Sequence, residues 1–142
     1  MERSRTPVKV VFDTSAYVAA LLSKTGGAAA IFERVLEQQF FNFYTDEMLV
    51  ELERVLARPK FRLEMEKREH FLHLIREGSF QVQQLNEFVV KKCRDPQDDK
   101  FLSLAKQIDA DYIISLDEDL LVLKHFGSTH ILTPGEFLAL FK

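Results

Sequence analysis

Residues 8–12, which read VKVVF, are the stretch that decides the fold of this chain. Their β-branched and aromatic side chains form a short apolar run that is typical of a buried strand. The run ends at residues 13–15, DTS, whose short polar side chains are suited to cap a helix that starts over residues 16–22. The beginning of the chain therefore predicts a buried strand that leads directly into a helix.

Segments with the same two kinds of pattern alternate along the rest of the chain. Pro59 breaks the third predicted helix or opens the next one, and residues 80–92 favour neither state. Because strands alternate with helices, the sequence predicts an α/β fold with a mainly parallel sheet. The further strands are expected over residues 40–44, 112–116 and 130–132, and the further helices over residues 28–38, 46–56, 64–76, 98–108 and 134–141.

The length and composition are those of one ordinary globular domain. The chain has 142 residues, of which 46% are hydrophobic and 29% are charged, so we expect a single domain over residues 1–142. The formal net charge of −3 excludes a strongly basic protein that attracts nucleic acid through its overall field. The lone Cys93 excludes an intramolecular disulfide, and no apolar run is long enough to cross a membrane. We therefore expect a cytoplasmic protein that makes no use of a membrane, with residues 1–7 as a flexible N-terminal extension.

Acidic residues fall at the places where this fold would bring them together. Asp13 follows the first strand, and Asp117 follows the strand over residues 112–116. Glu51 lies one turn into the predicted helix over residues 46–56, and Asp99 lies in the first turn of the one over residues 98–108. Ligands of open α/β sheets bind beyond the carboxyl ends of the strands, so these four acids are expected to share one cleft. Clustered carboxylate oxygens are ligands for Mg²⁺ or Mn²⁺, which activate water at phosphate groups.

Each of these acids also has a purely structural explanation. Asp13, and either Asp98 or Asp99, can cap a helix through the side-chain carboxylate. Glu51 lies in an acidic, solvated helix face, and residues 117–119 can form an exposed acidic turn. The residues alone therefore predict an α/β domain with an acidic cleft, and leave its activity open.

Five blocks of sequence carry a family resemblance, and the first is residues 10–15, VVFDTS, with its strand and first acid. The five blocks together resemble the PIN domain family, in particular members that act as toxins of toxin–antitoxin pairs. They occur in the family's order, cover nearly the whole chain and contain every acid of the pattern, although Ser15 stands where many relatives have Asn. The other blocks are residues 48–61, 93–105, 110–121 and 131–138.

The resemblance implies a three-layer α/β/α sandwich and a metal-dependent endoribonuclease that hydrolyses single-stranded RNA. It implies that Asp13, Asp99 and Asp117 hold one or two Mg²⁺ or Mn²⁺ ions, and that Glu51 holds a water molecule or a second ion. Supporting positions are implied for the side chains of Thr14, Asp98, Ser115 and Asp119.

The third acid has two candidates, because Asp98 and Asp99 are adjacent. We prefer Asp99, since Leu102 and Ala105 follow it at the spacing of the family block. Helical periodicity places these two apolar residues on the core side and is expected to aim Asp99 at the cleft.

RNA binding by an acidic protein requires local cations, and nothing in the sequence reads base identity. Solubilising surface charge is the alternative role of these cations. The resemblance further implies a small antitoxin protein as partner and a homodimer. The candidate contacts to the RNA backbone are Arg58, Lys60, Lys91, Lys92 and Arg94.

Two other functions remain open at this point. The first is a PIN-fold module that binds RNA or protein without cutting. The second is a metal-dependent phosphatase, which also begins with an Asp after the first strand but needs another Asp where Ser15 stands.

Overall fold

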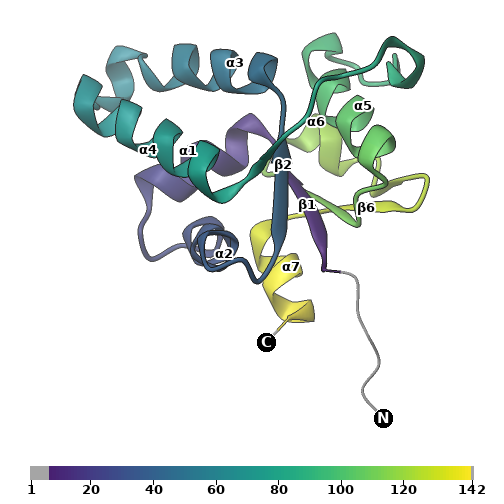
Figure 1. The fold of residues 1–142 in the computed structure, drawn as a ribbon, viewed down its shortest axis with the longest axis horizontal. Coiled ribbons are helices and arrows are strands. Elements are labelled where there is room, and N and C mark those ends of the chain that lie inside the picture. The colour runs from purple at the N-terminus through teal and green to yellow at the C-terminus, as the bar shows by residue number, and fades with distance from the viewer. Residues whose placement is uncertain (1–6, 142) are drawn as a thin grey trace.

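The computed structural model describes residues 7–141, so the N-terminal extension expected over residues 1–7 lies outside the described residues except for Pro7. At its centre is a six-stranded sheet with the strand order β3-β2-β1-β4-β6-β5 (Figure 1). The strands are β1 (Lys9–Phe12), β2 (Phe41–Tyr44), β3 (Phe80–Gln81), β4 (Tyr112–Ile114), β5 (His125–Phe126) and β6 (Thr129–Leu132).

The sheet is parallel except at one edge. β1 pairs in parallel with β2 on one side and with β4 on the other, and β4 pairs in parallel with β6. The register between β1 and β4 matches Val11 to Ile113 and Phe12 to Ile114. Among the strands that the structure describes, only the short β5 runs antiparallel, in a hairpin with β6. The predicted mainly parallel α/β sheet is therefore confirmed.

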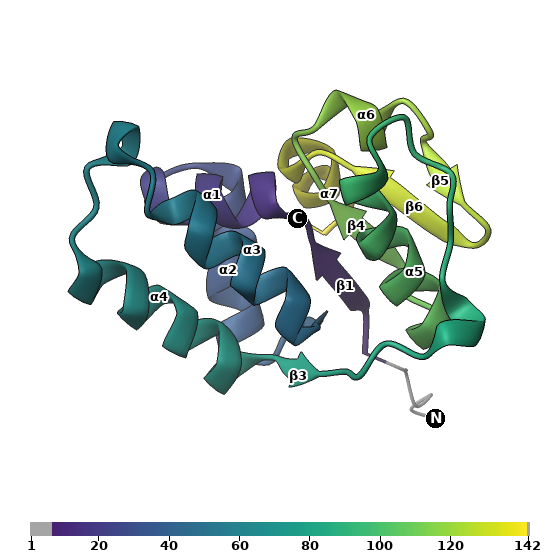
Figure 2. The ribbon, with the colours of Figure 1, turned by 90° about the horizontal axis from the view of Figure 1, so that it is seen from above.

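Helices cover both faces of the sheet, which gives the predicted three-layer α/β/α sandwich. Phe137 of α7 packs edge-on against Tyr112 of β4, with ring centroids 5.3 Å apart, whereas Figure 2 shows α5 on the other side of β4. The helices are α1 (Thr14–Leu22), α2 (Gly27–Leu36), α3 (Asp46–Leu56), α4 (Met65–Gly78), α5 (Asp99–Ile108), α6 (Glu118–Leu121) and α7 (Pro134–Leu140), with single 3₁₀ turns η1 (Pro59–Phe61), η2 (Asn86–Phe88) and η3 (Pro96–Asp98).

The predicted elements form where their local signals lie, and two strands and one α-helix have no predicted counterpart. Thr45 caps α3 through its side-chain oxygen, and Pro59 opens η1 instead of extending the preceding helix. Gly78 ends α4 at a close approach, since a Cβ there would lie 2.6 Å from a side-chain carbon of Leu36. The sequence analysis did not foresee the edge strand β3, the four-residue helix α6 or the antiparallel strand β5.

The strand order changes direction beside β1, and this determines where a ligand can bind. The chain passes from β1 outward through β2 to β3, and then returns to place β4 on the other side of β1. The carboxyl ends of β1 and β4 therefore diverge into loops on opposite sides, which opens a crevice at this edge of the sheet. Asp13 follows β1 at this crevice, and Ser115 follows β4.

Within residues 7–141, no single helix combines the length and the apolar composition that a membrane span requires. The adjacent α1 and α2 meet the criterion only as a pair, bent by 96°.

Candidate active site

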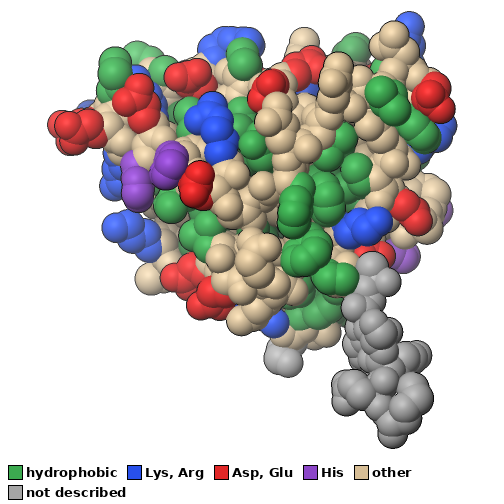
Figure 3. Space-filling model, viewed as in Figure 1, with side chains coloured by type: hydrophobic (Ala, Val, Ile, Leu, Met, Phe, Trp, Pro, Cys, Tyr) green, Lys and Arg blue, Asp and Glu red, His purple; other side chains and the backbone are tan. Residues whose placement is uncertain are grey.

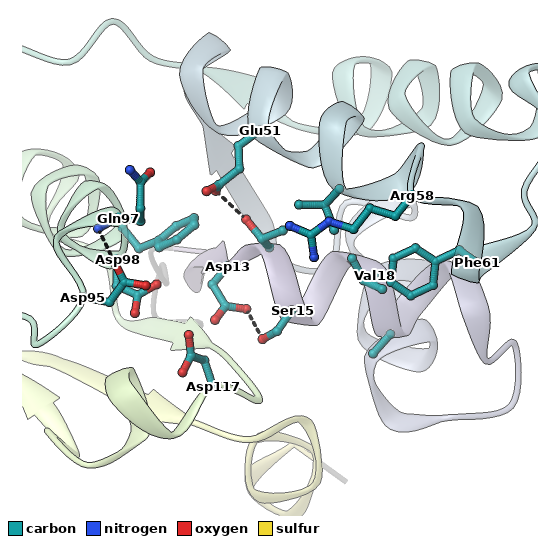
Figure 4. A pocket seen from close by; sticks show the side chains of 14 residues that line it. Asp13, Ser15, Val18, Glu51, Arg58, Phe61, Asp95, Gln97, Asp98 and Asp117 are labelled. Atoms are coloured by element: carbon teal, nitrogen blue, oxygen red, sulfur yellow. Dashed lines mark hydrogen bonds between the residues drawn. The ribbon is translucent and has the colours of Figure 1, made fainter.

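A cleft of about 610 Å³ lies at the carboxyl ends of β1 and β4. Its walls come from α1 and α3 on one side and from η3 and the start of α5 on the other. Figure 4 shows Asp13 in the middle of the cleft, with Glu51, Asp98 and Asp117 arranged around it. The structure therefore brings acids from four separate segments of the chain into one cavity. A shared cleft for acids from four segments was expected from the sequence.

Asp13 is the most deeply buried of these acids, with 2% of its surface exposed. Its Oδ1 accepts hydrogen bonds from the Ser15 hydroxyl at 2.7 Å and from the Ala16 amide at 2.8 Å, and the Ser115 hydroxyl donates to Oδ2. Burial raises the pKa of Asp13 to about 6, although these donors oppose the rise and Asp117 adds to it. Asp13 thus caps α1 and faces the cleft, so the structural and the functional explanation both apply to this residue.

The third acid in the cleft is Asp98, and the expectation that Asp99 points there is wrong. Asp98 is 7% exposed and lines the cavity, whereas the Oδ1 of Asp99 accepts from the amides of Lys92 and Cys93 at 2.9 and 2.7 Å. These amides hold the pKa of Asp99 below its usual value, although partial burial opposes them. Asp99 therefore anchors the preceding loop, outside the cleft.

The reason lies in the 3₁₀ turn η3, which ends at Asp98 and passes directly into α5. On the continued helix Asp98 shares one face with Phe101, Leu102 and Ala105, at the spacing of three, four and seven residues, and all three are buried. Asp99 instead shares a face with Ser103, whose hydroxyl donates to its carbonyl oxygen at 2.9 Å. The same periodicity argument, applied one residue earlier, would have selected Asp98.

Asp117 is joined to Asp13 through Ser115. The amide of Asp117 donates to the Ser115 hydroxyl at 2.9 Å, while the Asp117 carboxylate caps α6 by accepting from the amide of Asp119 at 2.9 Å. Ser115 is fully buried, and its two bonds therefore connect the ends of β1 and β4 at the base of the cleft.

Glu51 reaches the cleft from α3 and has a partner on each carboxylate oxygen. Its Oε1 accepts from the hydroxyl of Thr14 at 2.8 Å, and the Lys100 ammonium lies 3.3 Å from Oε2. The supporting role expected of Thr14 thus corresponds to a contact with Glu51. Sequence reasoning missed Lys100, because nothing in the sequence connects a residue of α5 with one of α3.

Asp98 also belongs to a second group of neighbouring acids, in addition to its place beside Asp13 and Asp117. Single oxygens of Asp95, Asp98 and Asp119 lie within 4.8 Å of one another, close enough to share a cation. Arg94 already pairs with Asp119 at 2.5 Å, and the carboxylate of exposed Asp95 caps the turn at the Gln97 amide. We therefore regard Asp95 and Asp119 as the outer edge of the acidic cleft, with Asp98 common to both sets. The sequence analysis did not single out Asp95.

The predicted RNA-contacting cations are not all near the cleft. Arg58 lines its far wall together with Phe61, and Arg94 lies at the acidic edge on Asp119. Lys60 lies over the Phe61 ring at 5.1 Å, and Lys91 and Lys92 border a separate hollow. On the face seen in Figure 3, acidic and basic side chains are interspersed over the described part of the chain, and no continuous basic band crosses it.

The donor set fits a divalent cation of the Mg²⁺ or Mn²⁺ type. Its members are carboxylate oxygens, and within residues 7–141 the buried Oδ2 of Asp98 has no hydrogen-bond partner. Burial, followed by the charges of Asp117, Asp95 and Asp13, raises the pKa of Asp98 to about 7. A cation between these groups would relieve both the repulsion and the unmatched oxygen.

Comparison with known proteins agrees with this geometry. The family model described as PIN domain matches residues 9–119, a range that includes all the acids of the cleft. The chain is also 27% identical over 144 residues to uncharacterized protein MJ1680 of Methanocaldococcus jannaschii. That match covers 95% of this chain and 92% of the relative.

Proposed function

Because this chain belongs to the PIN domain family, whose members are generally nucleases, we propose that its acidic cleft hydrolyses single-stranded RNA with bound Mg²⁺ or Mn²⁺. One observation carries the proposal. Asp98, whose buried Oδ2 has no hydrogen-bond partner within residues 7–141, lines the same cavity as Asp13 and Asp117. An inert core would not retain such a group, since a buried unpaired carboxylate is costly.

The ligands of the ion would be Asp13, Asp98 and Asp117, with Asp95 and Asp119 at the outer edge. When bound, such an ion activates water for attack on phosphorus and offsets the negative charge that develops on the phosphate oxygens. This assignment replaces Asp99 by Asp98, keeps Asp13 and Asp117, and leaves Glu51 out of the ligand set.

The chain's own residues orient the acids and bind the substrate. Ser15, Ser115 and the Ala16 amide fix both oxygens of Asp13, so that the carboxylate is preorganised without the ion. Arg58 supplies a positive charge on the opposite wall, where it can contact a phosphate of the RNA backbone. Val18 and Phe61 line the same wall and offer an apolar surface to a base or a ribose.

The test is cleavage of a panel of end-labelled single-stranded RNAs by the metal-stripped protein, with Mg²⁺ or Mn²⁺ added back. We expect cleavage only with the metal, and a loss of about a hundredfold or more in Asp13→Asn. Cleavage that persists with a chelator, or at full rate in Asp13→Asn, would contradict the proposal. Metal and RNA binding without any cleavage would favour the non-catalytic binding module.

The biological role follows as a further part of the same proposal. As a toxin, the chain would cut RNA until a small antitoxin protein inserts a segment into the cleft. Expression of the chain should then arrest bacterial growth, and co-expression of a small neighbouring reading frame should restore it. Growth arrest that persists in Asp13→Asn would argue against a nuclease toxin.

A homodimer is proposed for the apolar surface beside the edge strand. Phe80, Leu85 and Val89 expose 43%, 47% and 50% of their surface, and Figure 3 shows hydrophobic side chains gathered on this side of the molecule. Light scattering after size-exclusion chromatography should give twice the chain mass. The monomer mass at all concentrations would exclude the dimer.

A further inference from the structure

We propose that Lys100 is a built-in counter-ion for Glu51, and that it restricts the cleft to a single divalent cation. The inference rests on the proposed function, because it concerns how many ions the nuclease site takes. In it, Glu51 orients groups in the cleft without acting as a metal ligand, and the ammonium of Lys100 occupies the position where a second ion would otherwise be drawn.

Lys100 is fixed in place by contacts with three other residues. Its side chain is only 11% exposed, and the Nζ atom donates to the Gln97 carbonyl oxygen at 2.5 Å in addition to its contact with Glu51 Oε2. The same Nζ lies 5.2 Å from the centre of the Phe101 ring, a cation–π distance. A lysine held in this way from three sides has lost the mobility of a solvated surface cation.

Glu51 and Asp98 differ in how far their carboxylate oxygens are already hydrogen-bonded. Both oxygens of Glu51 already have donors, from Thr14 on Oε1 and from Lys100 on Oε2. Asp98 lines the cavity and has a buried oxygen without a partner among the described residues. A cation therefore gains most next to Asp98, whereas one at Glu51 would first have to displace an ammonium.

Positive charge is distributed unevenly among the acids of the cleft. Within residues 7–141, Asp13, Asp98 and Asp117 make no ion pair, and Arg58 is the one lysine or arginine that lines the cavity. Glu51 has a partner of opposite charge at 3.3 Å. Two-ion nucleases hold their ions about 4 Å apart between shared carboxylates. The fixed ammonium of Lys100 beside Glu51 repels the second ion of such a pair.

The experiment counts Mn²⁺ ions on the full chain by isothermal titration and by electron paramagnetic resonance of the free ion. We compare wild type with Lys100→Met, and with Lys100→Gln, which removes the charge and keeps a donor for Gln97. Lys106→Met is the matched control, because it removes an exposed lysine from the same helix. Thermal unfolding of each variant confirms that it is folded.

Wild type and Lys106→Met are expected to bind one Mn²⁺ ion each. Lys100→Met and Lys100→Gln should gain a second site, at least tenfold weaker than the first, and Lys100→Arg should keep one. Two ions on wild type, or one ion on both uncharged variants, would overturn the inference. No ion on wild type would overturn it together with the metal site itself. One ion on wild type without RNA cleavage would contradict the proposed function alone.

Discussion

The hydroxyl of Ser115 donates a hydrogen bond to Oδ2 of Asp13, a contact between the ends of two adjacent parallel strands that are 102 residues apart in the chain. The same hydroxyl accepts from the amide of Asp117 at 2.9 Å. One buried side chain thus holds two acids of the cleft in fixed relation before any ion binds. Because the Ser115 hydroxyl preorganises both acids, its removal should change how the cleft binds a metal ion.

Replacing Ser115 with Ala should weaken metal binding and destabilise the protein. Asp13 loses a donor that lowers its pKa, so its carboxylate should be protonated at higher pH, and the pH at half-maximal Mn²⁺ binding should rise. The free energy of unfolding should fall by about 1–3 kcal/mol, as for other lost buried hydrogen bonds. Metal titration at several pH values and chemical denaturation measure the two effects.

The matched control for this variant is Ser103→Ala. Ser103 is also buried and makes two hydrogen bonds, to the Val90 amide and to the Asp99 carbonyl oxygen, outside the cleft. It should lower stability by a similar amount and leave the pH of metal binding unchanged. If both variants shift that pH equally, Ser115 has no special relation to Asp13.

Substitutions of Asp98 and of Asp99 should change the stability of the metal-free protein in opposite directions. Asp98→Asn removes a buried charge that neighbouring acids repel, so the melting temperature at about pH 8 should rise. Asp99→Ala removes the acceptor of two loop amides, so the free energy of unfolding should fall by about 1–3 kcal/mol. Thermal unfolding in chelator measures both, and equal signs would reject this division of roles.

The stability of the metal-free protein should fall as pH rises between about 4 and 7. The pKa values of Asp13 and Asp98 are raised in the folded state to about 6 and about 7, from 3.8 in the unfolded chain. Between these pKa values the folded state therefore binds more protons than the unfolded state. The stabilisation that this protonation gives at low pH is lost as both acids ionise. We expect a loss on the order of 2 kcal/mol for each group.

Saturating Mn²⁺ should reverse that pH dependence, because the ion binds the ionised acids of the folded state. Denaturation curves at about pH 5 and about pH 8, with metal and with chelator, make the comparison. A metal-free protein that grows more stable across this interval would show that these two acids do not carry raised pKa values.

Arg58 and Lys60 should differ in their effect on RNA. Arg58 lines the cleft, so Arg58→Gln should raise KM several-fold and weaken the salt dependence of binding, as expected for one lost phosphate contact. Lys60 lies outside the cleft on the Phe61 ring, and Lys60→Gln is the matched control with little expected effect. Steady-state cleavage at two salt concentrations distinguishes them, and equal KM values for both variants would exclude Arg58 as a contact.

Local sequence signals predicted the fold and most of the acids in the cleft. The VKVVF strand, the DTS cap and the acids at the ends of β1 and β4 are local signals, and the structure confirms the sheet that they predict. Asp98 could also have been found, because its spacing to Phe101, Leu102 and Ala105 marks the buried face of α5. The preference for Asp99 rests instead on its spacing to Leu102 and Ala105 alone, which leaves out the buried Phe101 and the continuation of η3 into α5.

Other features of the cleft depend on tertiary packing and have no local signal. Lys100 and Glu51 lie 49 residues apart on different helices, and no spacing rule connects them. Asp95 and Asp119 approach Asp98 only because the loop before α5 and the turn after β4 meet at one edge. The short elements β3, β5 and α6 contain two to four residues each, too few for a periodic pattern to reveal them.

The most direct test of the account is the Mn²⁺-dependent rate of RNA cleavage by Asp98→Asn, compared with that of Asp99→Asn. The two variants make the same chemical change at adjacent positions, one inside the cleft and one outside it. We predict a loss of about a hundredfold or more for Asp98→Asn and at most a few-fold for Asp99→Asn. Full activity of Asp98→Asn, or loss of activity only in Asp99→Asn, would contradict the acidic cleft as the site of hydrolysis.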